Sequence, residues 1–125
     1  MIKFYKCKHC KNIAVKVQDS KVPLVCCGEK MEELIPMQSD GALEKHLPVA
    51  TFDETSVKVS VGEVLHPMTD EHYISFVVVE LKDGYLLKYL SPSMQPIVTF
   101  DVKKEDVVSI YEYCTIHGLY KIDLK

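Results

Sequence analysis

The second part of the chain alternates between apolar and polar positions with a period of two, which is the repeat of a β-strand. Residues 56–61, Ser-Val-Lys-Val-Ser-Val, show the alternation most clearly, and residues 73–81 are rich in branched and aromatic side chains. Asp83-Gly84 is a hairpin turn signal. Further strand candidates are residues 85–90, 96–100, 108–113 and 119–124. Short strands separated by turns predict a small β-sandwich, and only residues 103–106 indicate a helical turn.

The first part of the chain has a different character, because it is rich in cysteine and carries no long apolar pattern. Composition changes across residues 36–41, where Met-Gln-Ser-Asp-Gly predicts a linker. We therefore expect two domains, residues 1–36 and residues 37–125. A segment shorter than roughly 40 residues seldom folds on a hydrophobic core alone, so the first domain needs a metal to hold it and should be disordered without one.

Composition limits the classes of partner. The chain has 125 residues, of which 47% are hydrophobic and 26% charged, as in a globular protein. Its formal charge of −3 offers no basic face for nucleic acid and no polybasic run for a membrane surface. No apolar run approaches the roughly 18 residues that span a bilayer, and because the first residues lack a basic-then-apolar pattern, we expect no signal segment. We expect a cytoplasmic protein that binds neither nucleic acid nor membrane.

Four of the five cysteines form one candidate metal site. Cys7 and Cys10 have the C-x2-C spacing that grips one ion, and the adjacent pair Cys26-Cys27 follows after fifteen intervening residues. An odd count of cysteines in a cytoplasmic chain favours metal or redox chemistry over disulfides. Zinc and iron both accept four thiolates, so the site can be either a structural zinc site without redox activity or a redox-active iron site. Because successive strand residues point to opposite faces, the backbone must turn at the adjacent pair, and Gly28 allows this.

The fifth cysteine, Cys114, stands three residues before His117 in the predicted turn between the last two strands. The sequence places three further histidines, His46, His66 and His72, in loops of the same part of the chain. His9 lies beside a completed set of ligands, so we expect it to be solvated. Because scaffolds usually place chemistry on connecting loops, the four histidines and one cysteine predict a second metal.

The set of candidate ligand atoms limits which element the second metal can be. Imidazoles suit iron, copper, nickel or zinc, and one thiolate adds a soft, strongly donating ligand. Blue copper sites use one cysteine, two histidines and often a methionine soon after the second histidine, but no methionine follows His117. A five-coordinate iron with four imidazoles and an axial thiolate would leave one position open to a small anion opposite the sulfur.

Together these residues resemble the desulfoferrodoxin family, the two-iron class of superoxide reductase, over the whole chain. The first part resembles desulforedoxin through Cys7-x2-Cys10-x15-Cys26-Cys27. The second part resembles neelaredoxin through Glu44-Lys45-His46-x-Pro48, His66-Pro67-Met68, His72 and Cys114-x2-His117-Gly118-Leu119. Members of the family more often carry tryptophan where this chain has Tyr73 and Tyr120, and the chain contains no tryptophan.

The resemblance implies a mainly β fold, in which a small desulforedoxin-like domain precedes an immunoglobulin-like β-sandwich, and it implies a homodimer. It also implies two iron ions per chain. The first is held by Cys7, Cys10, Cys26 and Cys27, and the second, catalytic iron is held by His46, His66, His72 and His117 with Cys114 as the axial ligand. The activity implied is one-electron reduction of superoxide to hydrogen peroxide, with electrons from a rubredoxin-like donor.

The resemblance also gives roles to the two residues before His46. The lysine that corresponds to Lys45 attracts superoxide and aids protonation, and the glutamate that corresponds to Glu44 occupies the open position of ferric iron. From composition alone, a solvated ion pair on a loop explains these two residues equally well.

Two alternative functions remain open at the level of sequence. The first is a non-catalytic iron protein that carries electrons or senses redox state. The second is a zinc-stabilised β-sandwich that binds a protein partner.

Overall fold

The computed structural model describes residues 1–39, 46–62 and 65–125, and nearly all of its regular structure is β. Two compact units divide the chain, Met1–Ile35 and Pro36–Lys125. The first contains β1 (Phe4–Lys6), β2 (Ile13–Val15), β3 (Val25–Cys26), β4 (Glu29–Lys30) and β5 (Glu32–Leu34). The second contains β6 (Pro48–Phe52), β7 (Val57–Val61), β8 (Ile74–Leu81), β9 (Gly84–Tyr89), β10 (Ile97–Phe100), the 3-10 turn Lys104–Asp106, β11 (Val107–Cys114) and β12 (Gly118–Asp123).

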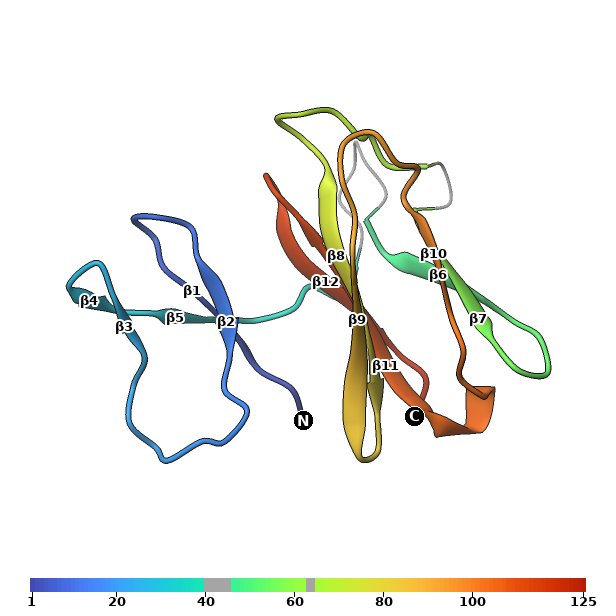
Figure 1. The fold of residues 1–125 in the computed structure, drawn as a ribbon, viewed down its shortest axis with the longest axis horizontal. Coiled ribbons are helices and arrows are strands. Elements are labelled where there is room, and N and C mark those ends of the chain that lie inside the picture. Colours follow the sequence, from blue (N-terminus) through green and yellow to red (C-terminus); the bar gives the residue numbers. More distant parts are fainter. Residues whose placement is uncertain (40–45, 63–64) are drawn as a thin grey trace. The chain divides into compact units, whose positions relative to one another are not determined.

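The second unit is built from two antiparallel sheets (Figure 1). One sheet has the strand order β10-β7-β6 and the other has the order β12-β11-β8-β9. The apolar residues of the alternating strands fill the space between them: Val57, Val59 and Val61 come from β7, and Ile74, Val77, Val79 and Ile110 come from the facing sheet. This is a mainly β fold, as predicted, and it is consistent with an immunoglobulin-like sandwich.

Three local differences from the sequence prediction have simple causes. Residues 48–52, which were not among the strand candidates, form β6, and Pro48 takes the first position of the strand, where proline is tolerated. The β8–β9 hairpin turns at Lys82-Asp83 rather than at Asp83-Gly84, since Leu81 pairs with Gly84. Met37 belonged to the expected linker, but its backbone bonds to Leu119 and Lys121 of β12. That segment is therefore attached to the sheet.

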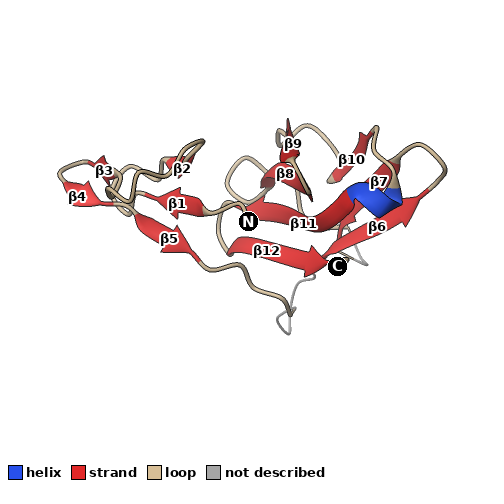
Figure 2. Cartoon of the chain, turned by 90° about the horizontal axis from the view of Figure 1, so that it is seen from below, coloured by secondary structure: helices blue, strands red, loops and turns tan. Residues whose placement is uncertain are grey.

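The first unit has very little hydrophobic core. A three-stranded sheet with the order β2-β1-β5 stands beside the two-stranded hairpin β3–β4 (Figure 2). Phe4 and Cys7 are the buried residues of this unit, and the remaining side chains are half-buried or exposed. Burial of one phenylalanine contributes about 1.5–3 kcal/mol, which is small against the entropy of ordering some 35 residues. The fold of this unit therefore needs another source of stability.

Candidate metal centres

Four cysteine sulfurs converge in the first unit. The Sγ atoms of Cys7, Cys10, Cys26 and Cys27 all lie within 4.8 Å of one another. Those of Cys10 and Cys26 are 3.5 Å apart. Four sulfurs at about 2.3 Å from a common ion in a tetrahedron are separated by slightly less than about 4 Å, so the donor set fits one tetrahedral metal. The structure thus brings together all four residues that the sequence singled out.

The turn at the adjacent cysteine pair has the geometry of a tight hairpin. Cys26 ends β3, Glu29 begins β4, and these two residues face each other in register. The two residues between them, Cys27 and Gly28, have φ angles of 52° and 77°, as a two-residue type I′ turn requires. A non-glycine residue at positive φ is unfavourable, so Cys27 carries strain that metal binding can offset. Gly28 permits the turn, as expected, but the cysteine itself also adopts the left-handed conformation.

The C-x2-C turn positions its first sulfur through a backbone donor. The N–H of Cys10 points at the sulfur of Cys7, with an N–S distance of 3.5 Å. This contact stabilises the thiolate and lowers the pKa of Cys7 to about 6. Cys27 responds in the opposite direction: hydrogen bonding to the sulfurs of Cys10 and Cys7 raises its pKa to about 12. Four thiolates so close together repel one another, and a bound cation removes this conflict.

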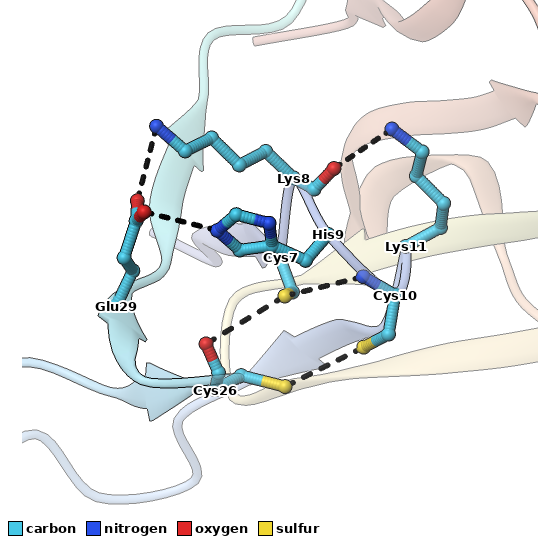
Figure 3. Close-up of polar contacts among 7 residues, drawn as sticks. All are labelled: Cys7, Lys8, His9, Cys10, Lys11, Cys26 and Glu29. Atoms are coloured by element: carbon cyan, nitrogen blue, oxygen red, sulfur yellow. Dashed lines mark hydrogen bonds and ion pairs between the residues drawn. The ribbon is translucent and has the colours of Figure 1, made fainter.

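An exposed cluster of polar contacts around Glu29 links the two halves of this centre (Figure 3). The carboxylate of Glu29 lies 3.0 Å from the Nζ of Lys8 and 3.0 Å from the Nε2 of His9. Glu29 raises the pKa of Lys8, and Lys8 lowers the pKa of Glu29. His9 is exposed, as expected, but it contacts this carboxylate. The sequence offered no signal for Glu29, because its contact with Lys8 and His9 depends on the β3–β4 turn.

The second group of ligands lies at strand ends of the sandwich. His46 precedes β6, His72 precedes β8, Cys114 is the last residue of β11, and His117 lies in the turn before β12. Their candidate ligand atoms, with one from His66, all lie within 4.8 Å of one another. Cys114 is paired with Ile74 in the sheet, which explains why the β11 terminus meets the segment that carries His72. All five predicted ligands are therefore brought together.

The four imidazoles form a closed ring of contacts. His46 contacts His66 at a centroid distance of 4.7 Å, and His66 contacts His72 at 4.7 Å. His72 contacts His117 at 5.1 Å, and His117 contacts His46 at 4.8 Å, which closes the cycle. Each neighbouring pair is steeply inclined, with interplanar angles between 61° and 87°. Four rings in a cycle present four nitrogens to a common centre.

Hydrogen bonding and the distance between nitrogens identify the nitrogen that three of these rings can offer. The Nδ1 of His66 is 2.8 Å from the carbonyl oxygen of Pro67, so this nitrogen donates its proton and the Nε2 keeps its lone pair. The Nδ1 of His117 is 3.1 Å from the Nε2 of His46. Two nitrogens at right angles around one ion, each about 2.1 Å from it, are about 3 Å apart. The ring therefore fits His117 as an Nδ1 ligand and His66 and His46 as Nε2 ligands.

The sulfur of Cys114 lies beside this group and is buried. Cys114 is 0% exposed, and His46 and His66 are also buried, whereas His117 is exposed. Its Sγ is 3.5 Å from the Nε2 of His66 and 3.7 Å from the Nδ1 of His117. The N–H of His117 points at this sulfur with an N–S distance of 3.4 Å, as the N–H of Cys10 does toward Cys7. Both centres thus stabilise a thiolate by the N–H three residues later.

A tyrosine packs against the ring of histidines. Tyr120 lies on β12, and its ring is stacked on the imidazole of His46 with a centroid distance of 4.5 Å and an interplanar angle of 9°. Tyr120 is buried, so the contact leaves His46 little freedom to rotate. The sequence identified Tyr120 as a departure from tryptophan, but it gave no indication of the histidine that it contacts.

Two predicted functional residues, Glu44 and Lys45, lie outside the described residues. Within the part of the chain that the structure describes, no helix is long and apolar enough to cross a membrane.

Comparison with known proteins agrees with the geometry of both centres. The family described as desulfoferrodoxin matches residues 38–123. Desulfoferrodoxin from Nitratidesulfovibrio vulgaris is 40% identical over 119 residues, which cover 95% of this chain and 94% of that protein. Superoxide reductase from Pyrococcus abyssi is 30% identical over 100 residues, covering 66% of this chain and 87% of that protein.

Among solved structures, the superoxide reductase from Treponema pallidum has a TM-score of 0.83 and 31% identity, and the match covers 98% of each chain. The one-iron superoxide reductase from Giardia intestinalis matches with a TM-score of 0.52 and 26% identity, covering 65% of this chain and 99% of that chain.

The chain belongs to the desulfoferrodoxin family. The two ligand groups fit the two iron sites of that family, one of four thiolates and the other of four imidazoles and one thiolate.

Proposed function

We propose that the protein is a superoxide reductase, which reduces superoxide by one electron to hydrogen peroxide at the iron held by His46, His66, His72, His117 and Cys114. The observation that supports this most directly is the closed cycle of four imidazoles with the buried sulfur of Cys114 next to two of them. Four imidazole nitrogens and one thiolate would hold the iron and would leave it able to bind one further small ligand.

Iron held by these residues would supply the electron for superoxide, and electron donation from the Cys114 thiolate would strengthen its reducing power. The chain contributes a fixed geometry. The carbonyl oxygen of Pro67 accepts a hydrogen bond from the Nδ1–H of His66. This bond fixes the tautomer in which the Nε2 is free to bind the metal. The N–H of His117 stabilises the negative charge on the Cys114 sulfur, and this reduces the electron donation from the sulfur to the iron. Burial of that sulfur keeps water and oxidants from it.

Glu44 and Lys45 are the residues that we propose for handling substrate and product. The ammonium group of Lys45 attracts the superoxide anion and supplies protons, through water, to the departing peroxide. The carboxylate of Glu44 serves as a ligand of ferric iron after turnover. The support for both roles is their position immediately before His46 and the family's pattern at this place.

The remaining parts of the proposal concern organisation. We propose that residues 1–36 form a domain that is stabilised by its four-cysteine iron, and that residues 37–125 form the catalytic domain. The proposed electron donor is a rubredoxin-like protein, the proposed assembly is a homodimer, and the proposed location is the cytoplasm. Support comes from the cysteine usage of the chain and from the family to which it belongs.

The test is consumption of superoxide by the reduced, iron-loaded protein under anaerobic conditions, compared with the variant Cys114→Ser. Serine offers a harder, poorer donor than thiolate, so the variant should keep its fold and lose the reaction. Superoxide consumption by the variant at the parental rate would refute the axial role of Cys114. If even the parental protein failed to accelerate superoxide loss, and added azide left the spectrum of its second iron unchanged, the electron-carrier alternative would replace this proposal.

A further inference from the structure

The two units differ in the sign of their charge. Residues 1–35 contain seven lysines and four acidic residues, which give a formal charge of +3. Residues 36–125 contain eight lysines and fourteen acidic residues, which give −6, so that the whole chain has −3. The positive charge of the protein is therefore concentrated in the unit that carries the four cysteines.

Within the first unit, the lysines gather around the metal-binding turns. Residues 6–12 and 25–30 include Lys6, Lys8, Lys11 and Lys30, and Glu29 is the acidic residue among them. Figure 3 shows Lys8 in the turn between Cys7 and Cys10 and Lys11 directly after it, with both side chains extending away from the drawn sulfurs. The Nζ of Lys11 lies 2.9 Å from the carbonyl oxygen of Lys8. Lys30 faces Val25 across the β3–β4 hairpin. Ferric iron with four thiolates adds a formal charge of −1. The net charge of these two turns therefore stays positive when iron is bound.

Two of the four sulfur ligands reach the surface amid this charge. Cys10 and Cys27 are exposed, whereas Cys7 is 2% exposed. Val25 beside them has 65% of its surface exposed, which supplies an apolar contact among the lysines. Exposed thiolate ligands give an electron a short path from a docked protein to the metal. Small interfaces of mixed polar and apolar character are typical of short-lived electron-transfer complexes.

We propose that the surface of these two metal-binding turns, which carries Lys8, Lys11, Val25 and Lys30 together with the exposed Cys10 and Cys27, is the docking site for a small acidic one-electron carrier. The inference rests on the proposed function, since a superoxide reductase must be resupplied with electrons. One electron passes from the reduced carrier to ferric iron of the four-cysteine centre, the carrier is oxidised by one electron, and no bond or proton is transferred. A second copy of this chain is the less favoured occupant, because it would bring two surfaces of the same positive charge together.

The experiment uses the full-length iron-loaded protein without superoxide and follows reduction of the four-cysteine iron through its thiolate charge-transfer absorption. The reductants are an acidic two-iron ferredoxin and a neutral quinol. For the ferredoxin, the second-order rate constant should fall as ionic strength rises, since ions screen attraction between opposite charges. In the variant Lys11→Gln, Lys30→Gln this constant should fall by about five- to tenfold at low salt, with a flatter salt slope. Reduction by the quinol should not change.

The matched control is Lys82→Gln, Lys103→Gln, which removes the same charge from exposed positions of the second unit. Its rate constant should stay within about twofold of the parental value. Equal losses in both variants would show a general charge effect and overturn the docking site. An equal loss with the quinol would place the effect on the metal site itself and would also overturn it.

A binding measurement separates docking from redox chemistry. In a titration of the zinc-loaded, 15N-labelled protein with oxidised ferredoxin, the amide signals of residues 8–11 and 25–30 should shift most. Shifts confined to the second unit would contradict the proposal, as would self-association through residues 8–11 and 25–30 in place of ferredoxin binding. Neither measurement uses superoxide, so failure here leaves the proposed enzymatic function standing, and failure of superoxide reduction leaves these results intact.

Discussion

Tyr120 lies almost parallel to the imidazole of His46, with the ring centroids 4.5 Å apart and the planes inclined by 9°. The neighbouring histidines, His66 and His117, contact His46 edge to face. His46 is therefore held on three sides by other rings. A stack of this kind contributes about 0.5–1.5 kcal/mol beyond the burial of its area. Tyr120 is thus a positioning residue that acts on the metal through His46.

The stack predicts different results for two substitutions. Tyr120→Phe keeps the ring and should leave iron retention unchanged. Tyr120→Leu loses the stack and should weaken retention of the second iron by about two- to tenfold, measured by competition with a chelator. Phe76→Leu removes a second aromatic stack, the one with Tyr113, and serves as the control that lowers stability without affecting iron retention. Equal iron retention in Tyr120→Leu and the parental protein would contradict the positioning role.

Removal of the first metal should unfold the first unit alone. Phe4 and Cys7 are its buried residues, and structural zinc in small domains contributes about 10–16 kcal/mol of binding energy, so the unit depends on its metal. In the double variant Cys10→Ser, Cys27→Ser, amide signals of residues 1–35 should collapse toward random-coil positions while those of the second unit persist. Cys114→Ser is the control that should leave residues 1–35 folded. A dispersed spectrum for those residues in the double variant would refute the dependence.

Alkaline pH should destabilise the protein through Tyr111. This side chain is buried and donates its hydroxyl proton to the Oε1 of Glu80, 3.1 Å away. Burial, followed by the charge of Glu80, raises the pKa of Tyr111 above its ordinary value. The folded state then binds this proton more tightly than the unfolded state does. The stabilisation is fully present below about pH 10 and is lost as pH rises from there toward the folded pKa.

Between pH 10 and pH 12, the free energy of unfolding should therefore fall by up to about 1.4 kcal/mol per pH unit from this group. The variant Tyr111→Phe should have a flatter alkaline slope in denaturant titrations. Tyr85→Phe, on the edge strand β9 of the same sheet and exposed, should keep the parental slope. The assignment to Tyr111 fails if its variant retains the full alkaline dependence.

The proposed electrostatic attraction of superoxide by Lys45 gives a kinetic prediction. Because superoxide is an anion, Lys45→Ile should lower the second-order rate constant for its consumption and flatten the dependence of that constant on ionic strength. We expect a reduction of about tenfold at low salt. Lys58→Ile, an exposed lysine on β7, provides the control. An unchanged rate and salt slope would remove Lys45 from the mechanism.

The ligands could be predicted from sequence because their spacing and residue type reflect metal chemistry directly. Cys7 and Cys10 are close in the chain, and Cys114 is an odd cysteine near His117. The strands could also be predicted where apolar and polar residues alternate, as in Val57–Val61. The central strand β8 was recognised instead by its branched and aromatic residues, since Val77, Val78 and Val79 are all fully buried.

Other features depend on tertiary structure and left no local signal. The stack of Tyr120 on His46 joins residues 74 positions apart, and it exists only because β12 pairs with β11. Residues 48–52 lack strict alternation, so β6 was largely missed, and its pairing with β7 determines that it forms. The left-handed φ of Cys27 is imposed by the two-residue turn, not by its own preference.

The most direct test of the central claim is the yield of peroxide from a superoxide pulse. The reduced, iron-loaded protein is mixed anaerobically with superoxide, and the hydrogen peroxide formed per superoxide consumed is counted. Reduction at the second iron predicts one peroxide for each superoxide. A yield of one peroxide for two superoxides would show dismutation and would contradict the proposed function, as would a rate of superoxide loss equal to that in buffer alone.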